Sequence, residues 1–214
     1  MNSKHIAQIQ LILEQLRVRD SEFWAENSQH VLRMLHKYKA KDFAQFIDLF
    51  QREIVDETGE PVLIYKTDDI FFEKLAGLLP MYIKDMSNAQ VIRTLEVCVA
   101  RNVGSQRLFD HYMLFMIEKH VLSYKVSEYS RMVRALAEKG FVEDYVFWDK
   151  FAFRYVFHDP RTGGERKFNN AQAKTLWDTF VFLKLKCPVI DIKDVLVQLE
   201  KFIEIEKIEA KASE

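Results

Sequence analysis

Apolar residues recur three and four positions apart through most of this chain. The spacing is found in seven stretches, at 70–79, 91–99, 108–117, 132–136, 146–151, 176–183 and 195–203. It places apolar side chains on one face of an α-helix. Glycine and proline, which interrupt helices, number only 6 and 4 in 214 residues. The sequence therefore predicts an all-α fold in which each helix buries one face.

The predicted helices alternate between two kinds, and this alternation predicts an internal repeat. Helices of one kind open with two adjacent apolar residues, and the second residues of these pairs are Phe71, Phe109, Phe147 and Leu196. The steps between them are 38, 38 and 49 residues. Helices of the other kind carry a basic residue two positions before a leucine, at Arg33, Arg93, Arg134 and Lys174. The last two steps of this second series are 41 and 40 residues.

These steps predict a right-handed-type array of about four stacked helix-turn-helix units, an α-solenoid, because such units cannot bury their apolar faces alone. Two segments rich in turn residues, 55–69 and 158–168, interrupt the repeat and are expected to be inserted loops. A small β-hairpin is the alternative for the second segment. The predicted boundaries are a single helical-repeat domain over 1–204 and a fraying, charged C-terminal tail over 205–214.

The segment SNAQ, which begins at Ser87, returns as NNAQ at Asn169. Ser87 is a preferred residue at a helix N-cap, and Gln90 three positions later completes a capping box. The repeated segment therefore predicts a capped helix start at both places, and Ser127 is expected to cap the helix between them. The two segments are 82 residues apart, whereas the basic residues that follow them are 81 apart. The register between the units is therefore open by one residue.

Charge is nearly balanced, with 31 basic and 32 acidic residues and a net charge of −1. Proteins whose main task is to bind nucleic acid usually carry a clear basic excess, although a balanced total leaves room for a local basic patch. Cys98 and Cys187 lie in apolar runs and lack the CxxC spacing. No disulfide framework is expected, and a reducing compartment is favoured.

No apolar run reaches the roughly 18 residues of a spanning helix, so no transmembrane span is expected. Near the N-terminus, Ile6, Ile9, Leu13 and Leu16 share one helical face. The preferred interpretation is a packed first helix. The alternative is a retained organellar targeting helix, although the segment has few basic residues for that role.

The familiar catalytic and cofactor-binding motifs are missing from the sequence. It contains no GxGxxG, no P-loop, no HExxH and no GxSxG. Its 6 histidines have no metal-ligand spacing to one another or to the cysteines. We therefore expect a protein that is not an enzyme, with no catalytic, cofactor-binding or metal site and no bound cofactor.

The strongest candidates for a binding role are the repeated basic residues Arg33, Arg93, Arg134 and Lys174. Equivalent positions of stacked repeats form a ladder, and such ladders contact successive nucleotides in RNA-binding repeat proteins. The alternative is that these are ordinary exposed helix residues, partly neutralised at Arg134 and Lys174 by acidic residues four positions on. Trp24 and Trp148 are expected to be partly exposed, as anchors for a protein partner.

Two segments carry a resemblance to a known group of proteins. In 87–117 and 127–151, a capped helix, a short turn and a helix that opens LFD or VFWD follow in order. Over roughly 70–203 the chain resembles the organellar helical-repeat proteins, namely octotricopeptide and heptatricopeptide arrays and the repeat regions of FAST-kinase-like mitochondrial proteins. The resemblance implies a mitochondrial or chloroplast location and, most often, RNA binding.

Short arrays of this style also resemble accessory subunits of respiratory complexes, ATP synthase and the mitoribosome. The balanced charge favours this second role. We therefore expect a non-enzymatic scaffold that acts as a soluble, peripheral subunit of a large mitochondrial assembly, with other protein subunits as its partners. The alternative is an organellar RNA-binding protein that uses the basic ladder.

Overall fold

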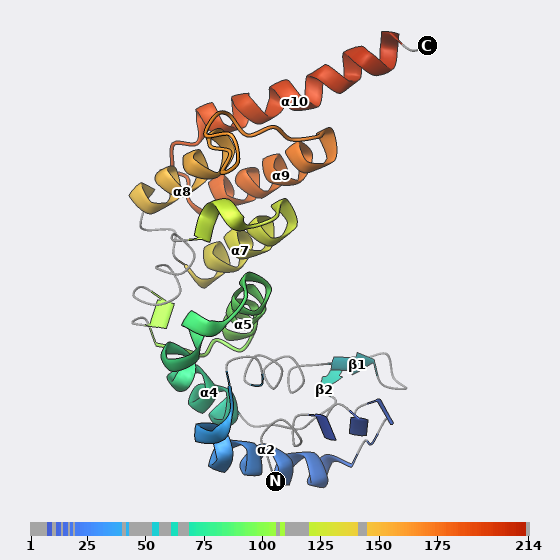
Figure 1. Cartoon of the computed structure of the whole chain (residues 1–214), viewed down its shortest axis with the longest axis vertical. Coiled ribbons are helices and arrows are strands. Elements are labelled where there is room, and N and C mark those ends of the chain that lie inside the picture. The colour runs from blue at the N-terminus through green and yellow to red at the C-terminus, as the bar shows by residue number, and fades with distance from the viewer. Residues whose placement is uncertain are drawn as a thin grey trace. The chain divides into compact units, whose positions relative to one another are not determined.

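The computed structural model of the chain contains two compact units, Met1–Met116 and Ile117–Glu214 (Figure 1). The structure describes residues 20–39, 69–105, 120–140 and 145–212, with the shorter pieces 8–9, 12–13, 15–16, 18, 42, 53–55, 61–63 and 108–109. Each unit is described by itself below. The single helical-repeat domain over 1–204 stays a prediction.

Helices make up most of the described part of the first unit. They are α2 (Ser21–Met34), α4 (Asp69–Tyr82) and α5 (Asn88–Ala100), with the 3-10 turns η1 (Leu35–Lys37) and η2 (Ile83–Asp85). Helix α2 packs against α4. Helices α4 and α5 confirm two of the helices predicted from apolar spacing.

A small β-hairpin reaches into the segment that the sequence predicts as the first inserted loop, 55–69. Strands β1 (Glu53–Val55) and β2 (Pro61–Leu63) pair in antiparallel fashion, with Val55 opposite Pro61. Proline has no backbone N–H for a sheet to use, and the first residue of a strand is one of the few places where a sheet tolerates it. The loop prediction is therefore wrong for these residues. Apart from this hairpin, the described secondary structure is helical.

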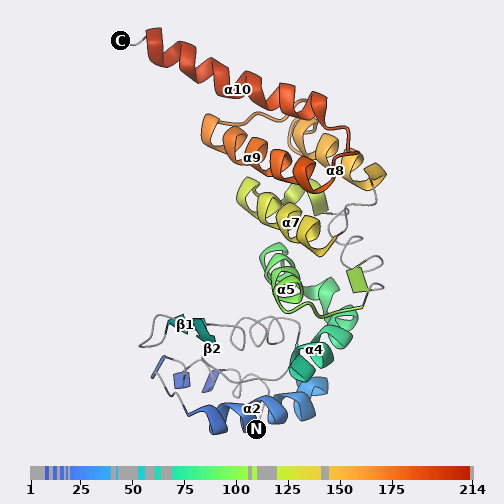
Figure 2. The ribbon, with the colours of Figure 1, turned by 180° about the vertical axis from the view of Figure 1, so that it is seen from behind.

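The second unit contains four α-helices and a 3-10 turn. They are η4 (Val121–Ser123), α7 (Val126–Lys139), α8 (Tyr145–Phe157), α9 (Asn170–Lys186) and α10 (Lys193–Ala212). Helix α9 lies between α7 and α10, and it packs against both (Figures 1 and 2). Helix α8 packs against α10 and η4.

Side-chain contacts show that α7 and α8 run antiparallel. The Tyr129 hydroxyl on α7 donates to the carbonyl of Phe151 on α8 at 3.3 Å. Further along α8, the Tyr155 hydroxyl donates to the carbonyl of Tyr124, which precedes α7, at 2.9 Å. Later residues of α8 thus meet earlier residues of the α7 segment.

Helices α7 and α9 run in the same direction, because later residues of one meet later residues of the other. The hydroxyl oxygens of Ser130 on α7 and Thr179 on α9 are 2.5 Å apart. One turn on, the Arg134 guanidinium lies over the Phe182 ring at 4.9 Å from its centroid. These contacts join the two helices along their length.

Helix α10 runs back along α9. Trp177 on α9 donates its indole N–H to the Glu200 carboxylate on α10 at 3.3 Å, and Phe168, just before α9, meets the ring of Phe202 at a centroid distance of 5.7 Å. The second unit therefore consists of two antiparallel helix pairs, α7–α8 and α9–α10. The first helices of the pairs are neighbours, and so are the second helices.

Both capping boxes predicted from the repeated segment are confirmed. The Ser87 hydroxyl accepts the Gln90 amide at 3.4 Å, and the Gln90 side chain accepts the Ser87 amide at 2.9 Å. Asn169 and Gln172 make the same two bonds before α9, at 2.9 and 3.1 Å. Each box satisfies amides that a helix start would otherwise leave without acceptors.

Helices α5, α7 and α9 bury the same positions counted from their N-caps, which are residues four, seven, ten and eleven. The buried residues are Val91, Thr94, Val97 and Cys98; Tyr129, Met132, Ala135 and Leu136; and Ala173, Leu176, Thr179 and Phe180. The N-caps of α5 and α9 are the first residues of SNAQ and NNAQ. The structure therefore selects the 82-residue register over the 81-residue register of the basic residues.

The second inserted loop, 158–168, is confirmed. It contains a turn in which Asp159 N–H donates to the Gly164 carbonyl at 2.8 Å and Gly163 N–H donates to the Asp159 carbonyl at 2.9 Å. All of its residues are described and none is in a strand, so the hairpin alternative is wrong. At the C-terminal end, α10 continues through Ala212 and covers most of the expected tail. No helix in the described ranges is long and apolar enough to cross a membrane.

Candidate functional site

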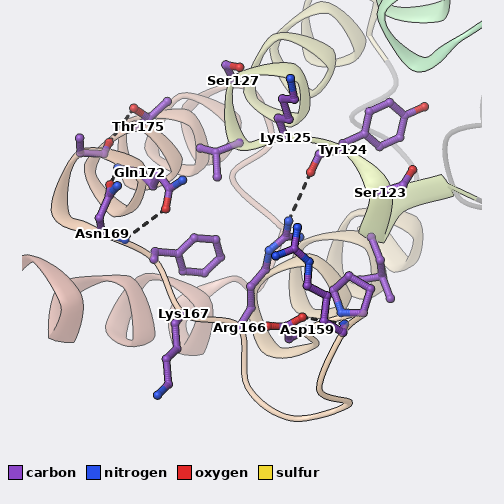
Figure 3. Close-up of a pocket in the computed structure, with 16 residues that line it drawn as sticks. Ser123, Tyr124, Lys125, Ser127, Asp159, Arg166, Lys167, Asn169, Gln172 and Thr175 are labelled. Carbon is purple, nitrogen blue, oxygen red and sulfur yellow. Dashed lines mark hydrogen bonds between the residues drawn. The ribbon is translucent and has the colours of Figure 1, made fainter.

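A cleft of about 810 Å³ lies in the second unit, where the starts of α7 and α9 face the loop between α8 and α9 (Figure 3). Its lining comes from 122–127, 159–161, 166–169 and the first turns of α9. Four basic side chains and a single acidic one line it: Lys125, Arg161, Arg166 and Lys167, against Asp159. The cleft is therefore positive in a chain whose net charge is −1.

Lys125 stands at the N-cap of α7, so the expectation that Ser127 caps this helix is wrong. A lysine side chain has only donors and cannot accept an amide of the first turn. The cap is made from the other side, because the Glu128 carboxylate accepts the Lys125 backbone N–H at 2.9 Å. With lysine at this position, the usual bond from a first-turn amide to the N-cap side chain is absent. The lysine instead places a positive charge at the edge of the cleft.

An aromatic column leads to Arg166, which lines the cleft. The rings of Phe147, Phe151, Tyr129 and Tyr155 stack in that order, with centroid distances of 5.2, 4.9 and 3.7 Å. The Arg166 guanidinium ends the column, 4.1 Å from the centroid of the Tyr155 ring. Stacking of a planar guanidinium on an aromatic face holds it in a fixed orientation.

Arg166 also bonds to the backbone. Its Nη2 donates to the Tyr124 carbonyl at 3.3 Å, and the same carbonyl accepts the Tyr155 hydroxyl (Figure 3). Its Nη1 is buried and has no hydrogen-bond partner in the described structure. An arginine has five N–H donors, so this group retains unused donor capacity next to the cleft.

Tyrosine ionisation is suppressed beneath the cleft. Burial, helped by the nearby Glu128 carboxylate, raises the pKa of Tyr124 to about 12. Burial raises the pKa of Tyr155 to about 12, against the opposing effect of Arg166. Burial also raises the pKa of Tyr129 well above its ordinary value. These hydroxyls are neutral donors at physiological pH, and they serve packing and orientation.

Asp159 is tied up by its own loop. Its carboxylate accepts the Arg161 backbone N–H at 2.7 Å, which closes an Asx-type turn. Gly163 follows with φ of 69°, a left-handed conformation that glycine adopts at little cost. The loop therefore holds Arg161 and Arg166 on one short, defined turn.

The predicted ladder residues occupy different positions along their helices. Counted from the N-caps, Arg93 is residue six, Arg134 is residue nine and Lys174 is residue five (93 − 87, 134 − 125 and 174 − 169). Positions five and six are about 100° apart around the axis, so Lys174 and Arg93 leave their helices in different directions, whereas Arg134 lies one turn further along its helix than Lys174 does. The residues that share the position of Arg93 are Arg131 and Thr175. The register of the basic residues therefore differs from the register of the N-caps in these three helices.

The four predicted basic residues have different surroundings. Arg33 is exposed on α2, and Lys174 is exposed on α9. Arg93 pairs with Glu96 at 3.7 Å on α5. Arg134 lies over Phe182. A role for any of them in contacting RNA or a partner stays a prediction.

Both predicted tryptophan anchors are buried, with 0% of each side chain exposed. The Trp24 indole donates to the Val18 carbonyl at 2.8 Å, and its ring packs edge-on against Phe23. Trp148 packs against Phe151 in the core of the second unit. The prediction that they are partly exposed is wrong. The polar residues next to them in the sequence belong to the other faces of their helices.

The sequence prediction missed the cleft residues themselves. The sequence pattern predicts an inserted loop over 158–168 and does not single out the basic residues of this loop. The available signal was local: three basic residues, Arg161, Arg166 and Lys167, lie within a turn-rich segment directly before the N-cap Asn169. What the sequence cannot display is Tyr124, which is 42 residues from Arg166 along the chain.

The cleft offers hydrogen-bond donors and positive charge. No group of three His, Cys, Asp or Glu side chains that could hold a metal ion is present in the described ranges. No protein-family model matches the sequence, and no curated protein matches it. The function of this protein is therefore inferred from the arrangement of residues in the two units.

Proposed function

We propose that this protein is a non-enzymatic helical-repeat scaffold that serves as a peripheral subunit of a large protein assembly. The observation that carries the proposal is the common plan of α5, α7 and α9. Their N-caps begin helices that bury the same four positions. Repetition of a helix start and of its buried face is what stacked helical units require, because each unit buries its face on its neighbours.

The packing of the second unit supports the same proposal. Its two antiparallel pairs place α7 beside α9 and α8 beside α10. Stacked helix pairs in repeat proteins have this order of neighbours. We extend this order to an array of about four units. The resemblance to organellar repeat proteins makes a mitochondrial assembly the proposed setting.

Exposed apolar side chains give such a scaffold candidate contact surfaces. Leu185 near the end of α9 and Val189 in the turn that follows are each 75% exposed. In the first unit, Met81 on α4 is 67% exposed. A single exposed apolar residue is ordinary, so these positions are starting points for interface mutagenesis.

Affinity purification of the tagged full-length protein, followed by identification of co-purifying proteins and RNA, tests the proposal. We expect a reproducible set of protein subunits that survives nuclease treatment. Leu185→Asp with Val189→Asp is expected to reduce that set if this surface is a contact. A change at an exposed apolar residue of another helix, Phe153→Asp on α8, is the control, with Phe153 48% exposed. Recovery of the tagged protein alone would contradict the proposal.

RNA binding is the second candidate, and the positive cleft is the observation that favours it. A protein that binds RNA through phosphates loses affinity steeply as salt rises. Titration with single-stranded RNA at low salt compares the native protein with Arg161→Ala, which tests the cleft, and with Ala substitutions at Arg33, Arg93, Arg134 and Lys174, which test the ladder. Absence of binding at low salt would remove this candidate.

A further inference from the structure

We infer that the cleft of the second unit receives a carboxylate-bearing segment of a protein partner, with Arg166 at its centre. The inference rests on the proposed scaffold function and gives that scaffold a specific contact. It concerns the residues that the sequence prediction treated as a plain surface loop.

Charge in the cleft is opposite in sign to that of the whole chain. Four basic side chains and one acidic side chain line it, so its formal charge is +3 (4 − 1), whereas the chain carries −1. The acidic member, Asp159, already accepts a backbone N–H within its loop. The cleft therefore attracts anionic groups and leaves its basic residues available to them.

Arg166 is prepared for an anion. Tyr155 orients its guanidinium plane, and the Tyr124 carbonyl fixes one of its two terminal nitrogens. The other terminal nitrogen is buried without a hydrogen-bond partner in the described structure. Arg166 lines the cleft, so its guanidinium can give a carboxylate charge-assisted N–H···O bonds from donors that the Tyr124 carbonyl does not occupy.

Arg166 and Arg161 are expected to contribute more than the lysines. Figure 3 shows Lys167 extending away from Arg166, and Lys125 lies on the opposite, α7 side of the cleft. The lysines therefore add to the positive field around the cleft. Arg161 is exposed, and its side chain lines the cleft.

The surroundings favour a peptide over RNA. Leu122, Val126, Pro160 and Phe168 contribute apolar surface to the lining, which suits the side chains that flank a carboxylate in a peptide. The acidic residues Glu128 and Glu165 adjoin the cleft in sequence and would repel a continuous phosphate backbone. A single carboxylate pairs with Arg166 without approaching both of them.

Fluorescence anisotropy on the full-length protein tests the inference. The probe is a short labelled peptide that carries a single glutamate between apolar residues, with peptides of equal length that carry lysine or serine in place of the glutamate as references. We expect binding of the acidic peptide alone, and weakening of that binding as salt rises. Arg161→Gln and Arg166→Gln are each expected to lower the affinity about tenfold or more, since each removes charge-assisted hydrogen bonds.

Matched controls separate binding from folding. Arg154→Gln removes the same charge from an exposed position on α8 outside the cleft, and it is expected to leave the affinity unchanged. Because Arg166 packs on Tyr155, Arg166→Gln is compared with Arg166→Lys by circular dichroism. If Arg166→Gln unfolds, Arg161→Gln decides the result, since its exposed side chain has little part in packing.

Four outcomes would overturn the inference. The first is equal affinity for the acidic and neutral peptides, and the second is an equal loss in the Arg154→Gln control. The third is tighter binding of a single-stranded RNA of matched charge that is also lost in Arg161→Gln, which would assign the cleft to RNA. Displacement of the peptide by inorganic phosphate at equal concentration would likewise point to a small-ion site and contradict a peptide site.

The inference and the proposed scaffold function can fail separately. Affinity purification of the Arg161→Gln variant tests whether the cleft contacts a partner. Affinity purification of the native protein tests whether the protein has partners at all. Unchanged partners in the variant would overturn the cleft contact while the scaffold stands. The absence of partners for the native protein would overturn the scaffold, whatever the peptide titration shows.

Discussion

Ser130 on α7 and Thr179 on α9 share a buried hydrogen bond, with 2.5 Å between their hydroxyl oxygens. The Thr179 hydroxyl also donates to the Thr175 carbonyl at 2.7 Å, so Ser130 is the donor to Thr179. Both residues lie in otherwise apolar helix faces. The bond fixes the relative position of the two helices, since sliding either one by a turn would take the Thr179 acceptor away from the buried Ser130 hydroxyl.

Substitution of these two hydroxyls should be non-additive. Thr179→Val leaves the Ser130 donor buried without an acceptor, and we expect a loss of ~1–3 kcal/mol in the free energy of unfolding. Ser130→Ala leaves the Thr179 donor bond intact and should cost ~0.5–1.5 kcal/mol. The double variant should cost less than the two together, because it leaves no hydroxyl behind. Denaturant unfolding of the four proteins measures this, and strict additivity would contradict the bond.

The N-caps predict one stabilising and one destabilising change. Asn169→Ala removes the acceptor for the Gln172 amide before α9 and should cost ~0.5–2 kcal/mol. Lys125→Ser supplies an acceptor that α7 lacks and should stabilise by ~0.5–1 kcal/mol. Thermal and denaturant unfolding read out both variants. A loss of stability in Lys125→Ser would show that the lysine has a packing role that its position does not suggest.

Two glycines form a matched pair with opposite expectations. Gly77 lies within α4, and a Cβ there would meet nothing within 4 Å, so Gly77→Ala should stabilise by ~0.5–1 kcal/mol. Gly140 ends α7 with φ of 93°, and a Cβ there has equal space. Gly140→Ala should nevertheless destabilise by ~1–2 kcal/mol, because the left-handed conformation is strained for alanine. Stabilisation of Gly140→Ala would contradict the assigned helix end.

High pH should destabilise the second unit. Tyr124 and Tyr155 have folded-state pKa values of about 12, above the ordinary 10.0. A pKa raised by folding gives stability that is complete below about pH 10 and is lost as pH rises through about 12. We expect the free energy of unfolding to fall across this window, by on the order of 2 kcal/mol for each tyrosine.

Tyr155→Phe is the control for the pH dependence. It removes one ionising group. The free energy of unfolding should therefore fall less steeply between about pH 10 and 12, and the difference in slope should be at most that produced by the ionisation of one group. The variant also loses the bond to the Tyr124 carbonyl and should be less stable at neutral pH. An unchanged slope would show that Tyr155 ionises without unfolding the protein.

Much of the helical fold was predictable because helix signals are local. The capping boxes at Ser87 and Asn169 depend on residues only three positions apart, and apolar spacing marks each buried face. The hairpin was missed because its strands are three residues long, too short for an alternating pattern to stand out. The sequence leaves the repeat register open by one residue, and the helix starts decide it, because a basic residue two positions before a leucine is a weaker marker than a capped start.

The candidate site was much less predictable. Burial of Trp24 depends on which elements pack against its helix. The polar residues on either side of Trp24 in the sequence wrongly predict that its side chain is exposed. Arg166 gains its orientation from Tyr124 and Tyr155, which come from other elements. A sequence shows which residues are charged. It does not show which charged side chain will be held in a fixed orientation by its neighbours and keep unused hydrogen-bond donors. The cleft was therefore visible only in three dimensions.

The size of the native particle that contains this protein tests the central claim most directly. Gentle extracts are fractionated by native size, and the protein is followed in each fraction with and without nuclease. The account predicts that it migrates with other proteins at a mass far above its own 25.4 kDa, and that nuclease leaves this mass unchanged. Migration at the mass of a single chain, or collapse of the particle on nuclease treatment, would contradict it.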